Sequence, residues 1–122
     1  MNSKILIIED ERSVRGLFSQ FLEHEGFQVE CASNGSEGLD KLKTAGADLV
    51  ITDIMMPEMD GLEVVREIRK VNSTLPIIAV SGGMSNGSVN YVSAARDFGA
   101  DVIFEKPVSL VDLLESVKKL IQ

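Results

Sequence analysis

Residues 47–61 read ADLVITDIMMPEMDG, an apolar run that ends in an aspartate and continues into a turn. Residues 49–52 are apolar almost without alternation, which is typical of a strand covered by helices on both faces of a parallel sheet. Pro57 has no backbone N–H and disfavours helical geometry at Met56, so we expect the strand to end near Asp53. Ligands of open α/β sheets bind at the carboxyl ends of strands, which makes Asp53 a candidate functional residue. An isolated aspartate in this place is more often a helix cap or turn residue.

Four further apolar runs indicate strands of the same kind. They lie in KILIIEDE, FQVECAS, LPIIAVS and DVIFEKP, which begin at residues 4, 27, 75 and 101. Apolar residues recur between these runs at spacings of three and four, as expected of helices with one buried face. They are Val14, Leu17, Phe18, Phe21 and Leu22; Leu39 and Leu42; Leu62, Val65 and Ile68; Val89, Val92 and Ala95; and Leu110, Leu113, Leu114, Val117 and Ile121. Alternating strands and helices predict a doubly wound α/β fold with a five-stranded parallel sheet and five helices, in one domain spanning residues 1–122.

The composition restricts the compartment and the partners. A chain of 122 residues, 44% apolar and 25% charged, can bury one core without disulfides. No apolar run approaches the length of a membrane span and no signal peptide opens the chain, so we expect a soluble cytoplasmic protein that binds no membrane. The net charge of −7 speaks against nucleic-acid binding and favours protein partners. The single cysteine, Cys31, is expected to be a small buried residue.

Acidic, hydroxyl and basic side chains follow four of the predicted strands. Glu9 and Asp10 follow the first strand, Asp53 the third, Ser81 the fourth and Lys106 the fifth. A parallel sheet brings these strand ends to one edge, so we expect the five side chains to converge there. Individually they could be an acidic helix start, a turn serine and a surface lysine. Their joint placement is what favours a site.

The expected group has the chemistry of a Mg²⁺-dependent phosphoryl-transfer site. Crowded carboxylates repel one another and need a cation, and oxygen ligands without Cys or His favour Mg²⁺ over zinc. Lys106 and Ser81 would contact phosphoryl oxygens, and Asp53 would be the nucleophile that forms an acyl phosphate.

These motifs together resemble the response regulator receiver domain, the phospho-accepting module of two-component signalling. The matching stretches are IIEDE, DIMMPEMDG, IIAVSGG and FEKP, and the resemblance covers the whole chain. It implies a flavodoxin-like sheet with strand order 2-1-3-4-5. It also implies a cis peptide between Lys106 and Pro107, which proline makes tolerable.

The resemblance also assigns roles to the strand-end residues. It implies that Mg²⁺ binds Glu9, Asp10, Asp53 and the backbone carbonyl of Met55. Asp53 would be phosphorylated by a sensor histidine kinase or a phosphotransfer protein. The same resemblance makes Ser81 the switch hydroxyl and Lys106 the phosphate-binding lysine, and it implies a downstream effector protein or an output domain.

Three positions depart from the family pattern. Ile103 stands where the family often has a Tyr or Phe, with Phe104 on the other face of the strand, so we expect a switch confined to the loop and helix after Ser81. That loop is about three residues longer than is usual in the resembling family. Met55 and Gly83 stand where the family often positions the attacking water, and neither can hold it, which predicts slow self-dephosphorylation.

Rival functions fit the residues less well. A haloacid-dehalogenase-like phosphatase requires a general acid two residues after its nucleophile, where Met55 stands. A nucleotide or flavin binder requires a Gly-rich loop after the first strand, where EDERS is acidic. The remaining alternative is a degenerate receiver that acts as a phosphorylation-independent interaction module, although such a protein would lack Asp53 or Lys106. The only histidine, His24, is expected on the polar side of its helix, so the phosphodonor would be another protein.

Overall fold

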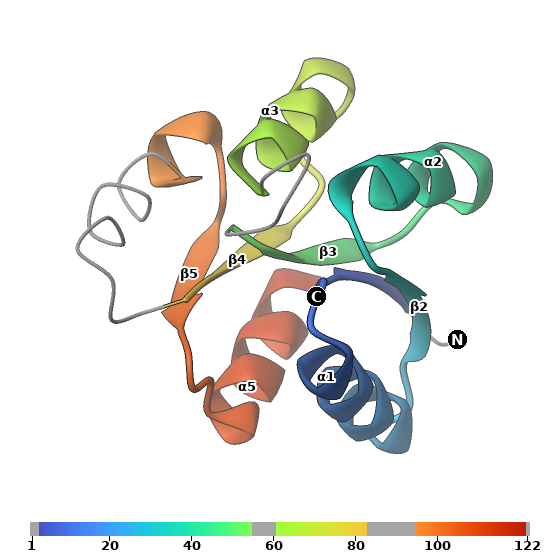
Figure 1. The fold of residues 1–122 in the computed structure, drawn as a ribbon, viewed down its shortest axis with the longest axis vertical. Coiled ribbons are helices and arrows are strands. Elements are labelled where there is room, and N and C mark those ends of the chain that lie inside the picture. Colours follow the sequence, from blue (N-terminus) through green and yellow to red (C-terminus); the bar gives the residue numbers. More distant parts are fainter. Residues whose placement is uncertain (1–2, 55–60, 83–94, 122) are drawn as a thin grey trace.

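The fold is a five-stranded parallel sheet with helices on both faces. The structure, a computed structural model, describes residues 3–54, 61–82 and 95–121. The strands are β1 (Lys4–Ile8), β2 (Gln28–Ala32), β3 (Leu49–Asp53), β4 (Ile77–Ser81) and β5 (Val102–Glu105), in the order β2-β1-β3-β4-β5 (Figure 1). The helices are α1 (Arg12–His24), α2 (Gly35–Ala45), α3 (Gly61–Val71) and α5 (Leu110–Ile121), and residues 95–98 are the described part of a further helical segment. The predicted fold class and strand order are confirmed.

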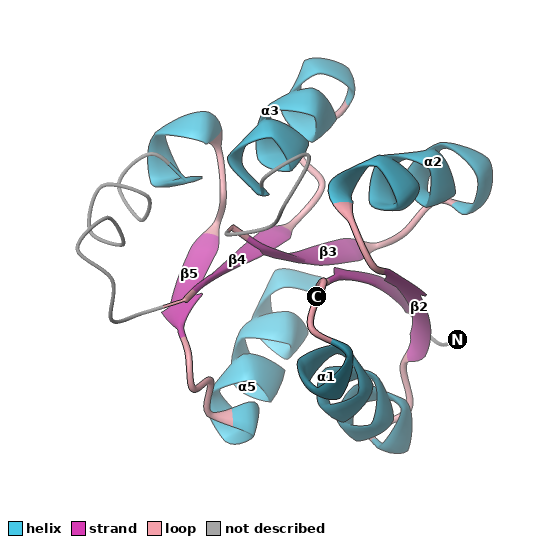
Figure 2. Cartoon of the chain, in the orientation of Figure 1, coloured by secondary structure: helices cyan, strands magenta, loops and turns pink. Residues whose placement is uncertain are grey.

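The core consists of two layers, one on each face of the sheet. Helices α1 and α5 cover one face, and α2 and α3 cover the other (Figure 2). Alternate residues of β1 belong to different layers: Leu6 and Ile8 pack under α2 and α3, whereas Ile5 and Ile7 pack under α1 and α5. Because every side chain from Ile5 to Ile8 is buried, this strand reads as a continuous apolar run. Burying each such isoleucine stabilises the fold by about 1.5 to 3 kcal/mol.

The register of the sheet aligns the carboxyl ends of its strands. Ile8 at the end of β1 pairs with Thr52 of β3, and the next residue of β3, Asp53, pairs with Val80 of β4. Ser81 pairs in turn with Glu105 at the end of β5. Residues that follow β1, β3, β4 and β5 therefore begin from one edge of the sheet.

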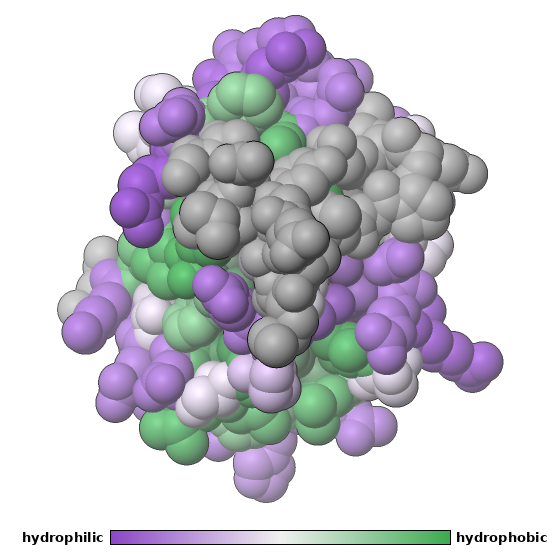
Figure 3. Space-filling view, turned by 60° about the vertical axis from the view of Figure 1, so that its left-hand side comes forward, coloured by the Kyte–Doolittle hydropathy of each residue, from purple (hydrophilic) through white to green (hydrophobic). Residues whose placement is uncertain are grey.

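Helix α1 corrects one sequence prediction. Leu17 was expected inward, but its side chain is 52% exposed, while Phe18 and Leu22 are buried. Consecutive residues differ by about 100° around a helix, so Leu17 lies at the rim of the apolar stripe, away from Phe18. Exposed apolar side chains are not unusual on this surface, since Figure 3 shows apolar residues (green) between hydrophilic ones (purple) on one face of the molecule. The expectation that His24 is exposed is confirmed.

One strand limit and one cysteine also differ from the sequence predictions. The fourth apolar run begins at Leu75, but β4 begins at Ile77 because Pro76 has no N–H to contribute to the sheet. The fifth strand, which was expected to be closed by Lys106 and Pro107, ends at Glu105. Cys31, expected to be buried, is only half-buried, because β2 is an edge strand.

Ile103 and Phe104 lie on opposite faces of β5, as the sequence predicts. Ile103 packs against the layer under α2 and α3, and Phe104 packs against the layer under α1 and α5. The peptide bond between Lys106 and Pro107 is cis. In the described part of the chain, no helix is both long and apolar enough to cross a membrane.

Candidate functional site

Two buried carboxylates lie at the carboxyl edge of the sheet. Glu9 directly follows β1 and is 2% exposed, and Asp53 is the last residue of β3 and is 4% exposed. The backbone N–H of Glu9 donates to Ala32 O at 3.0 Å, which extends the pairing of β1 with β2 by one residue. Arg15 donates from Nη1 to Glu9 O at 2.8 Å. The backbone that presents Glu9 is therefore fixed from both sides.

Asp10 completes a group of three carboxylates. One oxygen from each of Glu9, Asp10 and Asp53 lies within 4.8 Å of the others, and Asp10 is exposed whereas the other two are buried. Carboxylates at this separation repel one another, most strongly where water is excluded. The side-chain atoms of this group that could bind a metal are all carboxylate oxygens, which suits a hard divalent cation such as Mg²⁺. The predicted fourth ligand, the carbonyl of Met55, lies outside the described residues.

Lys106 brings a positive charge to the two buried carboxylates. Its Nζ lies 3.1 Å from Glu9 Oε1 and 3.3 Å from Asp53 Oδ2. Its backbone N–H donates to Ser81 O at 2.9 Å, which anchors the start of the turn after β5. Burial alone would lower the pKa of Lys106, but the Asp53 and Glu9 carboxylates outweigh that effect and raise it. Lys106 is therefore a charged group held between two carboxylates.

The protonation of Glu9 reflects this crowding. Burial raises the pKa of Glu9 to about 7, and the Asp53 carboxylate contributes to the rise. The backbone N–H of Glu11, which donates to Glu9 Oε2 at 3.0 Å, and the Lys106 ammonium both oppose it. Near neutral pH, the charge of the Glu9 carboxyl group therefore depends on Asp53, Lys106 and the Glu11 N–H.

Ser81 lies at the same edge as the acids. It is the last residue of β4 and is fully buried. The structure thus brings Glu9, Asp10, Asp53 and Lys106 into one cluster and places Ser81 beside it, at the strand that joins Asp53 to the Lys106 segment. Gly82 is described, but residues 83–94 lie outside the described residues, and so do the expected loop length and the helix positions Val89 and Val92. The slow self-dephosphorylation expected from Met55 and Gly83 therefore stays a prediction.

Gly61 is a site residue that sequence reasoning did not single out. A Cβ at this position would lie 2.1 Å from Asp53 O and 2.6 Å from Ile54 Cα, closer than real atoms approach. The Gly61 N–H also donates to Ile54 O at 2.8 Å. Helix α3 can therefore begin against the backbone of Asp53 only because residue 61 has no side chain. A glycine before an apolar helical stripe was the only sequence signal.

Comparison with known proteins gives the family. Residues 5–118 match the response regulator receiver domain. The chain belongs to this family. The arrangement of the receiver's acidic residues and lysine at one sheet edge agrees with that assignment, since phosphorylation and Mg²⁺ binding are typical of the family.

Relatives of this receiver occur in different contexts. The response regulator MprA of Mycolicibacterium vanbaalenii is 37% identical over all 122 residues, which cover 52% of that protein. The receiver therefore spans about half the length of the curated relatives it matches. A CheY-like receiver domain protein from Methanospirillum hungatei is 32% identical, with a TM-score of 0.91, over 99% of this chain and 94% of that one. A receiver domain of a signal transduction histidine kinase from Syntrophus aciditrophicus is 32% identical, with a TM-score of 0.87, over 98% of this chain and 89% of that one.

Proposed function

We propose that residues 1–122 form one receiver unit that accepts a phosphoryl group on Asp53 in a Mg²⁺-dependent reaction. The donor is a sensor histidine kinase or a phosphotransfer protein, and the signal passes to a downstream effector protein or an output domain. The observation that carries this proposal is the environment of Asp53: its buried carboxylate lies 3.3 Å from the Lys106 ammonium and within 4.8 Å of two further carboxylates. An ordinary helix-capping aspartate would have no reason to lie in such a cluster.

Each residue of the cluster has a role in this transfer. Glu9, Asp10 and Asp53 would hold Mg²⁺, which when bound supplies positive charge for the phosphoryl oxygens. An Asp53 oxygen forms the new bond to phosphorus while the phosphorus–nitrogen bond of the donor phosphohistidine breaks and the imidazole keeps the electron pair. Lys106 exchanges part of its contact with the carboxylates for a phosphoryl oxygen. The receiver is thus a phosphoacceptor that contributes to its own modification, and not a turnover enzyme.

The proposed switch begins at Ser81. A phosphoryl group on Asp53 would attract the Ser81 hydroxyl from the neighbouring strand and reorganise the loop at 82–88 and the helix that follows. Ile103 packs into the layer under α2 and α3 and has no hydroxyl or ring to follow that movement. We therefore expect the change to stay between residues 81 and 95. Backbone amide shifts with a phosphoryl mimic test this, and shifts spread evenly along β5 would contradict it.

Intact-mass spectrometry with a small-molecule phosphodonor tests the phosphoacceptor. The native chain should gain one phosphate with Mg²⁺ and none in excess chelator, because the acidic cluster repels an anion until it is neutralised. Asp53→Asn should gain none. Asp48→Asn, at the opposite end of β3, is the matched control and should gain one. An adduct on Asp53→Asn, or an equal adduct in chelator, would contradict the proposal and favour the phosphorylation-independent interaction module.

A further inference from the structure

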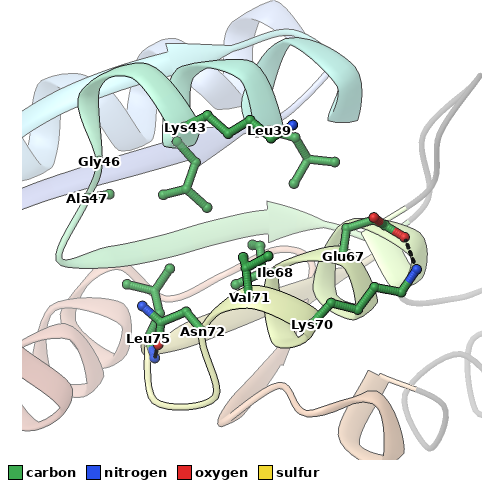
Figure 4. A pocket seen from close by; sticks show the side chains of 11 residues that line it. Leu39, Lys43, Gly46, Ala47, Glu67, Ile68, Lys70, Val71, Asn72 and Leu75 are labelled. Carbon is green, nitrogen blue, oxygen red and sulfur yellow. Dashed lines mark hydrogen bonds and ion pairs between the residues drawn. The ribbon is translucent and has the colours of Figure 1, made fainter.

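A groove lies between α2 and α3 and is lined by residues of both helices (Figure 4). Its volume is about 430 Å³. Gly46 and Ala47 line it just before β3 begins, and Asn72 and Leu75 line it just before β4. These are the amino-terminal ends of the strands, whereas Asp53 ends β3. The groove is therefore a separate feature from the phosphoacceptor site.

The walls of the groove are apolar. The apolar lining residues come from both helices and from the segments that follow them: Leu39, Leu42, Ala47, Ile68, Val71 and Leu75. Ile68 and Leu75 are buried beneath it, whereas Val71 is 82% exposed at its mouth. Gly46 ends α2 with a positive φ of 72°, which favours glycine, and neither it nor Ala47 has a side chain large enough to fill the space. A lining of this kind leaves apolar surface in contact with water.

The rim of the groove carries an excess of positive charge. Lys43 comes from α2, and Lys70 and Glu67 come from α3. Lys70 Nζ lies 2.9 Å from Glu67 Oε2, whereas Lys43 has no ion-pair partner within 4.0 Å among the described residues. The Lys70 ammonium is the main cause that lowers the pKa of Glu67, and the Arg66 and Lys43 charges contribute smaller effects. Lys43 and Lys70 both line the groove. Two cations and one anion make this rim basic in a chain of net charge −7.

We propose that this groove binds a small amphiphile with an aliphatic body and one carboxylate, such as a medium-chain fatty acid. The aliphatic part would cover Val71 and Ala47, and the carboxylate would pair with Lys43. A volume of 430 Å³ lies at the lower end of the range for small-molecule sites, which favours a short chain. The basic rim would repel the head group of a cationic amphiphile, and a fully polar ligand would leave the apolar floor of the groove uncovered.

Amide shifts of the ¹⁵N-labelled chain, titrated with decanoate below its micelle concentration, test the inference. Decanoate should shift the amides of Ala47, Val71 and Leu75 in a saturable way. Affinity should increase about fourfold per added methylene from hexanoate to decanoate, as expected for apolar burial. Decanol should bind at least fivefold more weakly, and decyltrimethylammonium should bind more weakly still. Equal binding of decanoate and decanol would overturn the assignment of a carboxylate.

Two matched pairs of variants locate the ligand. Val71→Asp places a carboxylate at the mouth of the groove, and its control Val111→Asp changes a valine that is 66% exposed on α5. Lys43→Glu reverses the unpaired charge, and its control Lys119→Glu changes an exposed lysine of α5. We expect each groove variant to weaken decanoate binding at least tenfold and each control to change it less than twofold.

Two further outcomes would overturn the binding of decanoate in this groove. Decanoate affinity that Val71→Asp leaves unchanged would overturn the proposed location. Amide shifts that depend on protein concentration and not on decanoate would show that two copies of the chain meet at this face, which would also overturn it. The inference does not depend on phosphorylation, so Asp53→Asn should bind decanoate as the native chain does.

Discussion

Carboxylates lie at both ends of the parallel strands, which we call the amino edge and the carboxyl edge of the sheet. The carboxylates at these two edges have different partners. At the amino edge, Asp48 Oδ2 accepts the Lys4 N–H at 2.7 Å, and Asp101 Oδ2 accepts the Ile77 N–H at 2.8 Å. Each of these exposed acids satisfies the backbone of a strand near its first residue. At the carboxyl edge, Glu9 and Asp53 are buried and face each other. The contrast separates acids that stabilise the fold from acids whose placement costs stability.

The amino edge shows how a carboxylate is fully satisfied. Arg69 Nη2 lies 3.1 Å from Asp101 Oδ2, and the same guanidinium donates to Gly99 O and Asn72 O at 3.0 and 3.1 Å. One residue of α3 thus ties the start of β4 to the segment before β5. An acid with backbone and guanidinium donors has little reason to bind anything else.

The carboxyl edge has the opposite balance. Lys106 is the cation within 4.0 Å of Glu9 and Asp53 among the described residues, and three carboxylates share its neighbourhood. Such a cluster is stable only because the rest of the fold holds it in place. It gains stability when another cation binds, which is the physical basis for the proposed Mg²⁺ site.

The largest expected effect comes from removing the lysine. Lys106→Met removes the ammonium group that lies beside the buried carboxylates of Glu9 and Asp53, so we expect the free energy of unfolding to fall by about 4 kcal/mol at pH 7 without Mg²⁺. Mg²⁺ should restore much of this loss, because it replaces the missing charge. Urea unfolding with Mg²⁺ and with chelator measures both quantities.

Arg69→Met is the matched control for Lys106→Met at the amino edge. It should also destabilise the fold, since three hydrogen bonds are lost, but by the same amount with and without Mg²⁺. If Mg²⁺ restores the stability of both variants equally, or of neither, then the two edges do not differ in their response to Mg²⁺.

The pH dependence of stability should show the next largest effect. The pKa of Glu9 is raised from 4.5 to about 7 in the folded chain, so the folded state binds a proton more tightly than the unfolded state between these values. The free energy of unfolding should therefore fall by about 3 kcal/mol as pH increases from 4.5 to 7. The size of this fall follows from the pKa of Glu9, which is about 2.5 higher in the folded chain, because a pKa difference of one corresponds to about 1.4 kcal/mol. Glu9→Gln should remove this fall, and so should Mg²⁺.

Glu37 provides a control of opposite sign. Its pKa is lowered, mainly by the Ser33 N–H that donates to Glu37 Oε1 at 2.8 Å before α2. The stability that Glu37 contributes is present above its unfolded pKa and is lost as pH falls. Urea unfolding at several pH values should thus show Glu37→Gln less stable than native near pH 7 and nearly equal at low pH. A fall with pH that survives Glu9→Gln would show that another group causes it.

The fold could be predicted largely because buried parallel strands need continuous apolar runs. Residues 5–8 and 49–52 have such runs, and the structure buries them on both faces. The order of the strands and the cis peptide at Pro107 came from family resemblance and not from the pattern itself. Leu17 was placed wrongly because a spacing of three or four does not distinguish the centre of an apolar stripe from its rim.

Because the carboxyl ends of parallel strands lie at one edge of the sheet, the sequence predicted which side chains of the site would come together. It did not predict how these side chains differ in burial. It treated Glu9 and Asp10 alike, whereas the structure buries one and exposes the other. The contact between Gly61 and the Asp53 backbone depends on how α3 packs against the sheet, which a local pattern does not contain. The groove beside Ala47 was missed for the same reason, since it forms between helices that are separate in sequence.

The smallest expected effect is also the closest matched test of the two edges. Arg69 Nη2 lies 3.1 Å from Asp101 Oδ2, and Lys106 Nζ lies at a similar distance, 3.3 Å, from Asp53 Oδ2. Asp101→Asn weakens a half-exposed ion pair, so it should lower the free energy of unfolding by about 1 kcal/mol. Asp53→Asn removes a charge that repels Glu9, so without Mg²⁺ it should raise that free energy by about 1 kcal/mol at pH 7. With Mg²⁺ the second variant should lose this advantage, because it also loses a ligand oxygen charge, while the first should not change. Urea unfolding of both variants under both conditions gives the signs directly. Loss of stability in metal-free Asp53→Asn would mean that its pairing with Lys106 outweighs the repulsion from Glu9.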